Sequence, residues 1–129
     1  MGPTELLKQA AAALQAGQWK QCSDLCDRVL LVEPGNPAAR HLRGIGVLQD
    51  GQVQRAVEDL EQVVDAHPSN THAALFLGRA LRLSDRNEDA IPVLESAVRD
   101  SNIAIDARYE LARCMSRARR SRDAIKQYR

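Results

Sequence analysis

The sequence has few aromatic side chains. Its 129 residues include one Trp, one Phe and two Tyr, so the core must be aliphatic and rich in alanine. Because strands favour β-branched and aromatic side chains, this composition favours helices over a β-sandwich. With 44% hydrophobic and 27% charged residues, the chain has the composition of a soluble folded protein, and its length suits one domain.

Long apolar runs are also missing. No stretch approaches the roughly 20 apolar residues that a membrane span needs. The start, MGPTELLKQA, lacks the basic flank and apolar stretch of a signal peptide. Three cysteines, Cys22, Cys26 and Cys114, are too few for a disulfide scaffold, which favours a reducing compartment. We expect a cytoplasmic protein with no membrane insertion, and the periplasm is the alternative.

Motifs for catalysis and metal binding are lacking as well. There is no glycine-rich phosphate loop, nucleophile elbow or pair of carboxylates in a catalytic context. Cys22 and Cys26 lie four residues apart, and we interpret them as core residues because a buried free cysteine behaves as a small hydrophobe. His67 and His72 flank a turn without nearby ligands, so a zinc site lacks support. The sequence predicts no enzyme, no catalytic residues, no metal and no cofactor.

What the sequence does contain is an internal period of 34 residues. Small residues recur where two helices would approach closely, and large apolar residues recur between them. The rows begin at Pro3, Pro37, Thr71 and Ile105. Column eight holds Ala10, Gly44, Gly78 and Ala112, column twenty holds Cys22, Ala56, Ala90 and Ala124, and column twenty-four holds Cys26, Leu60, Leu94 and Tyr128.

Turn residues recur in phase with the rows. The segments 33–37 (EPGNP) and 67–71 (HPSNT) close the first two rows, because Pro stops a helix and Asn caps the next one. A second set of turns divides each row into two helices of about 12–14 residues. These turns lie at residues 16–18, 50–52, 84–86 and, in the fourth row, 119–121. Residues 123–125 are therefore expected to open a further helix.

This pattern resembles the tetratricopeptide repeat (TPR), a helix–turn–helix unit of 34 residues. The resemblance covers the whole chain, with repeats at approximately 3–36, 37–70, 71–104 and an incomplete one at 105–129. It implies an all-α, right-handed superhelical solenoid of antiparallel helix pairs with about 3.7 repeats and seven or eight helices. We expect one domain over residues 1–129 and a fragment of a longer array or a larger protein.

The resemblance also places the first helix of each pair on a concave groove that receives a peptide. The groove is expected to be apolar at its N-terminal end and basic at its C-terminal end. Two alternatives stay open, since the leucines could be interhelical core and the arginines a solvated face. The expected lining is Leu7, His41, Leu42, Ile45, Leu48, His72, Leu75, Phe76, Arg79, Arg82, Tyr109, Arg113 and Arg117.

These features predict a non-catalytic protein–protein interaction scaffold. Our hypothesis is that the basic end binds an acidic segment or a C-terminal carboxylate while the apolar end takes a hydrophobic anchor. One variant of the family binds the acidic C-termini of cytosolic heat-shock chaperones through paired Lys/Asn and Lys/Arg positions. The matching columns here hold Leu7, Ala11, His72 and Phe76, so that carboxylate clamp is absent.

Other functions remain open because the charge is unevenly spread. Residues 108–129 hold eight Arg/Lys against two acids, a net +6, and residues 1–107 hold ten against fifteen, a net −5. The basic end could bind nucleic acid or another polyanion, although few aromatics are available for stacking. The chain could also be the TPR segment of a larger enzyme or of a secretion or export assembly. A fourth row that stops within its second helix predicts self-association through an uncapped C-terminal end.

Overall fold

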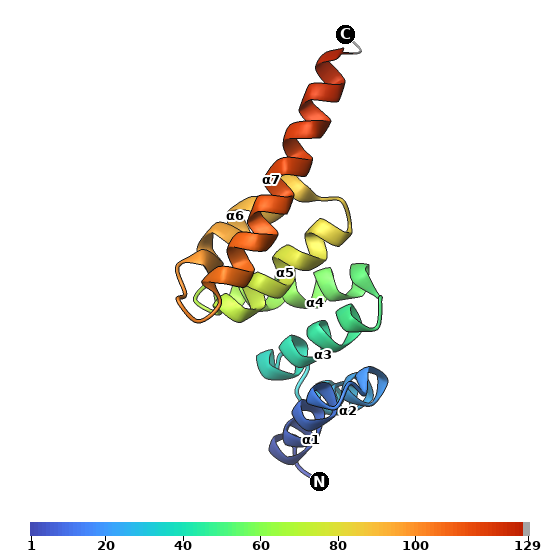
Figure 1. Ribbon diagram of the computed structural model, residues 1–129. Helices are drawn as coiled ribbons and strands as arrows, with labels where there is room; N and C mark the ends of the chain where they lie inside the picture. The colour runs from blue at the N-terminus through green and yellow to red at the C-terminus, as the bar shows by residue number, and fades with distance from the viewer. Residues whose placement is uncertain (128–129) are drawn as a thin grey trace. The chain divides into compact units, whose positions relative to one another are not determined.

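The computed structural model describes residues 1–127, and this part of the chain consists of α-helices with no strand (Figure 1). The all-α prediction is therefore confirmed. The chain divides into two compact units, which we call unit 1 (residues 1–68) and unit 2 (residues 69–129). The helices are α1 (Pro3–Gln15), α2 (Trp19–Val32), α3 (Pro37–Gln49), α4 (Val53–Ala66), α5 (Thr71–Leu83), α6 (Asn87–Val98) and α7 (Ala104–Gln127).

Unit 1 consists of two helical hairpins, α1–α2 and α3–α4, joined by packing of α2 against α3. The Asn36 side chain caps α3 by accepting a hydrogen bond of 3.0 Å from the Ala39 N–H, and Pro37 supplies the first helical residue. The core of this unit is aliphatic. It includes the two cysteines that the sequence predicts to be core residues, and Cys22, Cys26 and Val29 are fully buried.

The small residues of column eight lie at close helix crossings. A Cβ built on Gly44 would lie 2.8 Å from Leu60 Cγ, and one built on Gly78 would lie 2.2 Å from Leu94 Cδ2. No methyl group fits at either position unless the leucine moves. The second and third rows thus pair column eight with column twenty-four, as the period predicts.

Unit 2 consists of the hairpin α5–α6 and the long helix α7, which packs against both (Figure 1). Asn70 caps α5 by accepting from the Ala73 N–H at 3.1 Å, which repeats the Asn36 cap one row later. Pro92 lies in the first half of α6. The C-terminal part of α7 extends beyond α5 and α6 (Figure 1).

The expected turn at residues 119–121 is wrong, because α7 is one continuous helix of 24 residues. The first three rows turn at column fifteen, where Gly17, Gly51 and Asp85 have φ values of 76°, 89° and 61°. The residue after each closes a helix-capping hydrogen bond to the carbonyl five residues before it. Column fifteen of the fourth row holds Arg119, whose side chain disfavours a positive φ. No eighth helix therefore forms within residues 1–127.

The continuous helix also changes the surroundings of the fourth-row core columns. Ala112 and Ala124 occupy the small-residue columns eight and twenty, yet both are exposed. Met115, on a column that is buried in the second and third rows, is 52% exposed. The core assignment of Ala124 is thus wrong, and Tyr128 lies outside the described residues.

Candidate protein-interaction surface

Two of the predicted groove arginines meet a buried acid. Glu110 of α7 is only 4% exposed, and its Oε1 accepts from Arg79 Nε of α5 at 3.0 Å. Its Oε2 accepts a hydrogen bond from Arg82 Nε, which is also on α5. Burial raises the pKa of Glu110, but the hydrogen bonds and positive charges of Arg82 and Arg79 outweigh it and hold that pKa below its ordinary value. This ion-paired triad joins α5 to α7, and the Glu110 carboxylate partly compensates the charge of the two arginines.

Arg113 is positioned without an acid. Its guanidinium lies 5.4 Å from the centre of the Tyr109 ring, and its Nη1 donates to Tyr109 Oη at 2.9 Å. Both side chains come from one face of α7, one turn apart. The cation–π contact and the hydrogen bond therefore orient this guanidinium while leaving its charge uncompensated.

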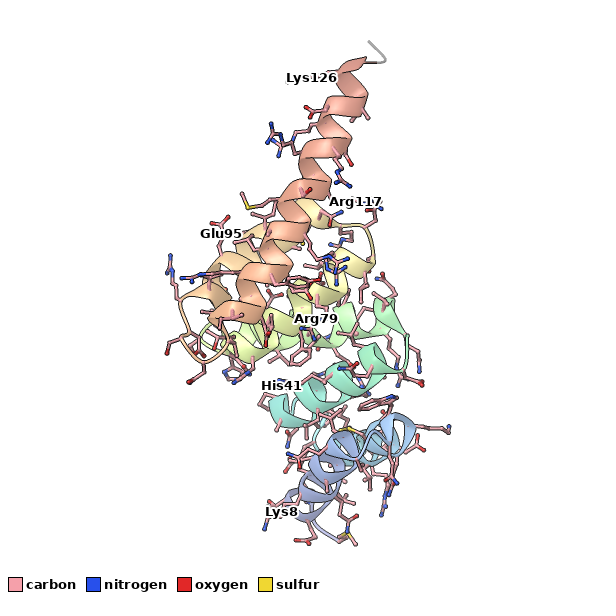
Figure 2. The ribbon with its side chains drawn as sticks, in the orientation of Figure 1. Lys8, His41, Arg79, Glu95, Arg117 and Lys126 are labelled. Carbon is pink, nitrogen blue, oxygen red and sulfur yellow. The ribbon has the colours of Figure 1, made fainter. Side chains whose placement is uncertain are left out.

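A pocket of ≈ 540 Å³ opens beside these arginines, entirely within unit 2. It lies between the end of α5, the turn into α6, the start of α6 and the middle of α7. Figure 2 shows Arg117 on α7, and its Nε lies 3.9 Å from Asp85 Oδ1. The lining residues are Arg82, Leu83, Asp85, Asn87, Arg113, Ser116, Arg117 and Arg120.

The predicted apolar lining is largely buried. Ile45, Leu48 and Leu75 are 9%, 6% and 4% exposed, so they offer little surface to a partner. Leu7 and Leu42 are half-buried and pack against the core of unit 1. The alternative that these leucines are interhelical core is the one that their burial favours.

The remaining predicted groove residues are more accessible. His41 and Phe76 are half-buried, and Phe76 lies beneath the Arg79 guanidinium at 5.2 Å. His72 and Tyr109 are exposed. Figure 2 shows His41 on α3 of unit 1 and Arg79 on α5 of unit 2.

Exposed apolar side chains also lie on α7. Ile105 near its start is 83% exposed, and Ile125 is 58% exposed in the part of the helix that extends beyond α5 and α6. A pocket of ≈ 530 Å³ lies between Met115 of α7 and Ile91 of α6. It is bordered by Arg119, Arg122, Asp123 and Lys126, so an apolar strip lies among mostly basic side chains.

The cysteines are packing residues. Cys22, Cys26 and Cys114 are buried and form no disulfide within residues 1–127. The contact with Cys22, together with burial, raises the pKa of the Cys26 thiol. Burial likewise raises the pKa of Cys114. Neither of these two thiols has the depressed pKa that makes a cysteine nucleophilic.

Residues 1–127 contain neither a metal-binding cluster nor a membrane-spanning helix. No group of three or more His, Cys, Asp or Glu side chains in this range is arranged to hold a metal ion. None of the helices in the same range combines the length and apolar character needed to cross a membrane.

Sequence reasoning missed Glu110, Asn87, Ser116 and Arg120. A signal for Glu110 existed, because its column holds Lys8 in the first row and the apolar residues Leu42 and Phe76 in the next two. An acid at a position that is apolar in the two rows before it needs a cationic partner if it is buried. Arg79 and Arg82, on the first helix of the row before, were the available partners.

Comparison with known proteins identifies the family. The family model described as "Tetratricopeptide repeat" matches residues 7–80, which is more than half of the chain. The chain belongs to the tetratricopeptide repeat family.

Similar curated proteins share only part of their length with this chain. Human "FK506-binding protein-like" is 36% identical over 81 residues, which cover 63% of this chain and 23% of that protein. Mouse "Sperm-associated antigen 1" is 26% identical over 98 residues, covering 76% of this chain and 10% of that protein. The chain thus spans less than a quarter of the length of these relatives.

Solved structures share the fold. MamA from Desulfovibrio magneticus RS-1, residues 41 to its end, superposes with a TM-score of 0.82 at 25% identity, covering 98% of this chain and 71% of that one. The first TPR domain of Spaghetti (RPAP3), bound to HSP90 peptide SRMEEVD, gives 0.81 at 18% identity and covers 88% and 90%. The Sgt2 TPR domain from Aspergillus fumigatus gives 0.77 at 20% identity, covering 96% and 82%. These likenesses confirm the TPR solenoid fold.

Proposed function

We propose that this chain binds an acidic segment of a partner protein on the basic surface of α7. The tetratricopeptide repeat fold is that of a protein-interaction scaffold, and its members are generally non-catalytic. The observation that carries the proposal is the group Arg113, Arg117 and Arg120, which lines one pocket with little opposing negative charge. Guanidinium groups bind carboxylates with charge-assisted hydrogen bonds.

The proposed site does not use the columns of the chaperone-binding clamp. The Spaghetti domain holds an HSP90 peptide, and the yeast Sti1 TPR2B domain is in a pHsp70 complex. The clamp columns of this chain hold Leu7, Ala11, His72 and Phe76, which supply no lysine or arginine. We therefore propose an acidic ligand that binds further along the repeats, at α7.

A peptide comparison tests this function. Fluorescein-labelled peptides of equal length, rich in Glu, in Ser or in Lys, are titrated with the full chain, each with a free or an amidated C-terminus. The Glu-rich peptides should bind, and binding should weaken as salt rises because exposed charges are screened. Equal binding of all three compositions, or no binding of any, would contradict the proposal. A difference between free and amidated ends shows whether a terminal carboxylate is part of the ligand.

We also propose self-association through the exposed apolar surface of α7, because Ile105 and Met115, about three turns apart on this helix, are 83% and 52% exposed. Like charges border this surface, so association should strengthen as salt rises. Sedimentation velocity at rising concentration measures it, with Ile105→Glu/Met115→Glu as the variant expected to stay monomeric. A wild-type chain that stays monomeric at high concentration and high salt would contradict this second proposal.

We propose a cytoplasmic location, because a chain with three buried free thiols suits a reducing compartment. Imaging of a fluorescent fusion of the full-length gene product tests this, and an export to an oxidising compartment would contradict it.

A further inference from the structure

We infer that the pocket between α5, α6 and α7 recognises an extended acidic segment whose carboxylates lie at alternate residues. This inference rests on the proposed function and specifies the chemistry of its ligand. The pocket volume of ≈ 540 Å³ lies within the range of about 300–1,000 Å³ that is usual for ligand-binding pockets.

The spacing of the arginines defines the ligand's shape. Arg113, Arg117 and Arg120 occupy positions i, i+4 and i+7 of α7, so they follow one face of the helix. At about 1.5 Å per residue their backbone positions span roughly 10 Å. Side chains on one face of an extended peptide recur at about 6.6–6.8 Å, every second residue. Carboxylates at alternate residues therefore match successive arginines, whereas neighbouring carboxylates point to opposite sides.

The three arginines differ from Arg82, the fourth arginine of the pocket. Arg82 is paired with buried Glu110, whereas Arg113 is held by Tyr109 and keeps its charge available. Arg117 has only a long contact with Asp85, and both side chains are mostly exposed. Arg120 has no ion-pair partner among residues 1–127. The pocket thus carries an excess of positive charge along α7.

Asn87 favours a peptide over a chain of phosphates. This residue lines the pocket and is 7% exposed, and its Nδ2 donates to Asp85 Oδ1 at 3.0 Å. Its Oδ1 has no hydrogen-bond partner within the described part of the chain. A buried acceptor without a partner is costly, and a donor removes that cost. A peptide carries backbone N–H donors together with its carboxylates, whereas a phosphate chain carries acceptors alone.

Two labelled peptides of identical composition test the inference. One has Glu at every second position among Ser residues, and the other has the same Glu residues in one block. The alternating peptide should bind the full chain more tightly than the block peptide at equal ionic strength. Equal affinities would overturn the alternate spacing. Tripolyphosphate and single-stranded DNA serve as competitors, and displacement at equal charge concentration would overturn the peptide assignment.

Charge reversal locates the site. Arg113→Glu/Arg117→Glu should weaken the alternating peptide by at least about tenfold, the loss expected for two charge-assisted hydrogen bonds. Arg108→Glu/Arg119→Glu makes the same charge change on exposed residues of the same helix outside this pocket, and should change affinity much less. Circular dichroism checks that both variants stay helical. Equal losses of peptide affinity in the two variants would show that this pocket is not the binding site, although the ligand would still be acidic. Absence of binding to every acidic peptide would instead refute the proposed function.

A second variant addresses Asn87 separately. Asn87→Leu removes the unpaired acceptor with little change in size. It also removes the hydrogen bond to Asp85, but that carboxylate is 81% exposed and water can replace the donor, so the free chain should melt at the same temperature or higher. The same variant should bind the alternating peptide less tightly. A lower melting temperature with unchanged affinity would show that Asn87 has a structural role only, and would remove it from the recognition site.

Discussion

Glu110 determines how much uncompensated positive charge α5 presents through Arg79 and Arg82. Without it, Arg79 and Arg82 would extend the basic surface of α7 across α5. With it, these two arginines join α5 to α7, and the available cationic side chains are those further along α7. A single buried carboxylate therefore moves the candidate site toward the C-terminal half of the helix.

The first prediction concerns the pH dependence of stability. The pKa of Glu110 is lowered from its ordinary value of 4.5, so its ion pairs stabilise the fold above that pH and are lost as the pH falls through the folded-state pKa. Glu110→Gln should lower the free energy of unfolding at neutral pH by about 1.5–3 kcal/mol. It should also flatten the loss of stability between about pH 5 and pH 3.

Urea denaturation at a series of pH values measures both effects. Glu95→Gln is the control, because Glu95 is an exposed acid on α6 (Figure 2). A Glu110→Gln variant with the stability and pH profile of the control would show that the triad contributes nothing to folding.

At the scale of the helix, the turn residues of the 34-residue rows correctly predicted five breaks between helices, at residues 16–18, 33–37, 50–52, 67–71 and 84–86. Gly17 and Gly51 provide a positive φ directly, and Asp85 tolerates one. The same column count placed a turn at Arg119, where the side chain does not favour that conformation. Periodicity indicates where a turn is expected, but only the residue at column fifteen determines whether the chain turns.

The second prediction tests the continuity of α7. Backbone NMR chemical shifts should be helical through residues 119–121 in the wild-type chain. Arg119→Gly supplies the residue type that turns the earlier rows and costs the helix about 1 kcal/mol, so helical shifts after residue 119 should diminish. Non-helical shifts at 119–121 in the wild type would contradict the straight helix and restore the predicted turn.

The third prediction concerns the helix crossing at Gly78. An added Cβ would lie 2.2 Å from Leu94 Cδ2, so Gly78→Ala should destabilise the chain by about 1–3 kcal/mol. Gly35→Ala is the matched control, because nothing lies within 4 Å of a Cβ there. Thermal and urea unfolding measure both.

A double variant shows whether the cause is the leucine. Leu94→Ala alone leaves a cavity, whereas in the Gly78→Ala background the added methyl occupies part of that space. The two costs should therefore be non-additive by about 0.5 kcal/mol or more. Strict additivity would mean that the two residues do not compete for the same volume.

At the scale of the molecule, the fold could be predicted from the sequence because each row repeats the same columns. The site could be predicted only in part. Charge and spacing pointed to Arg113 and Arg117 on α7, but the pairing of Arg79 and Arg82 depends on a contact between residues about thirty positions apart. Arg120 lines the pocket because α7 continues as a helix through residues 119–121, where the 34-residue period predicts a turn.

The central claim is that the arginines of α7 bind an acidic segment, and a charge-swap titration tests it most directly. The wild-type chain and Arg113→Glu/Arg117→Glu are each titrated by fluorescence anisotropy with an alternating Glu peptide and with the same peptide carrying Lys. We predict that the wild type binds the Glu peptide, that the variant loses it by about tenfold or more, and that the variant gains affinity for the Lys peptide. Unchanged binding of the Glu peptide by the variant, with no gain for the Lys peptide, would contradict the account.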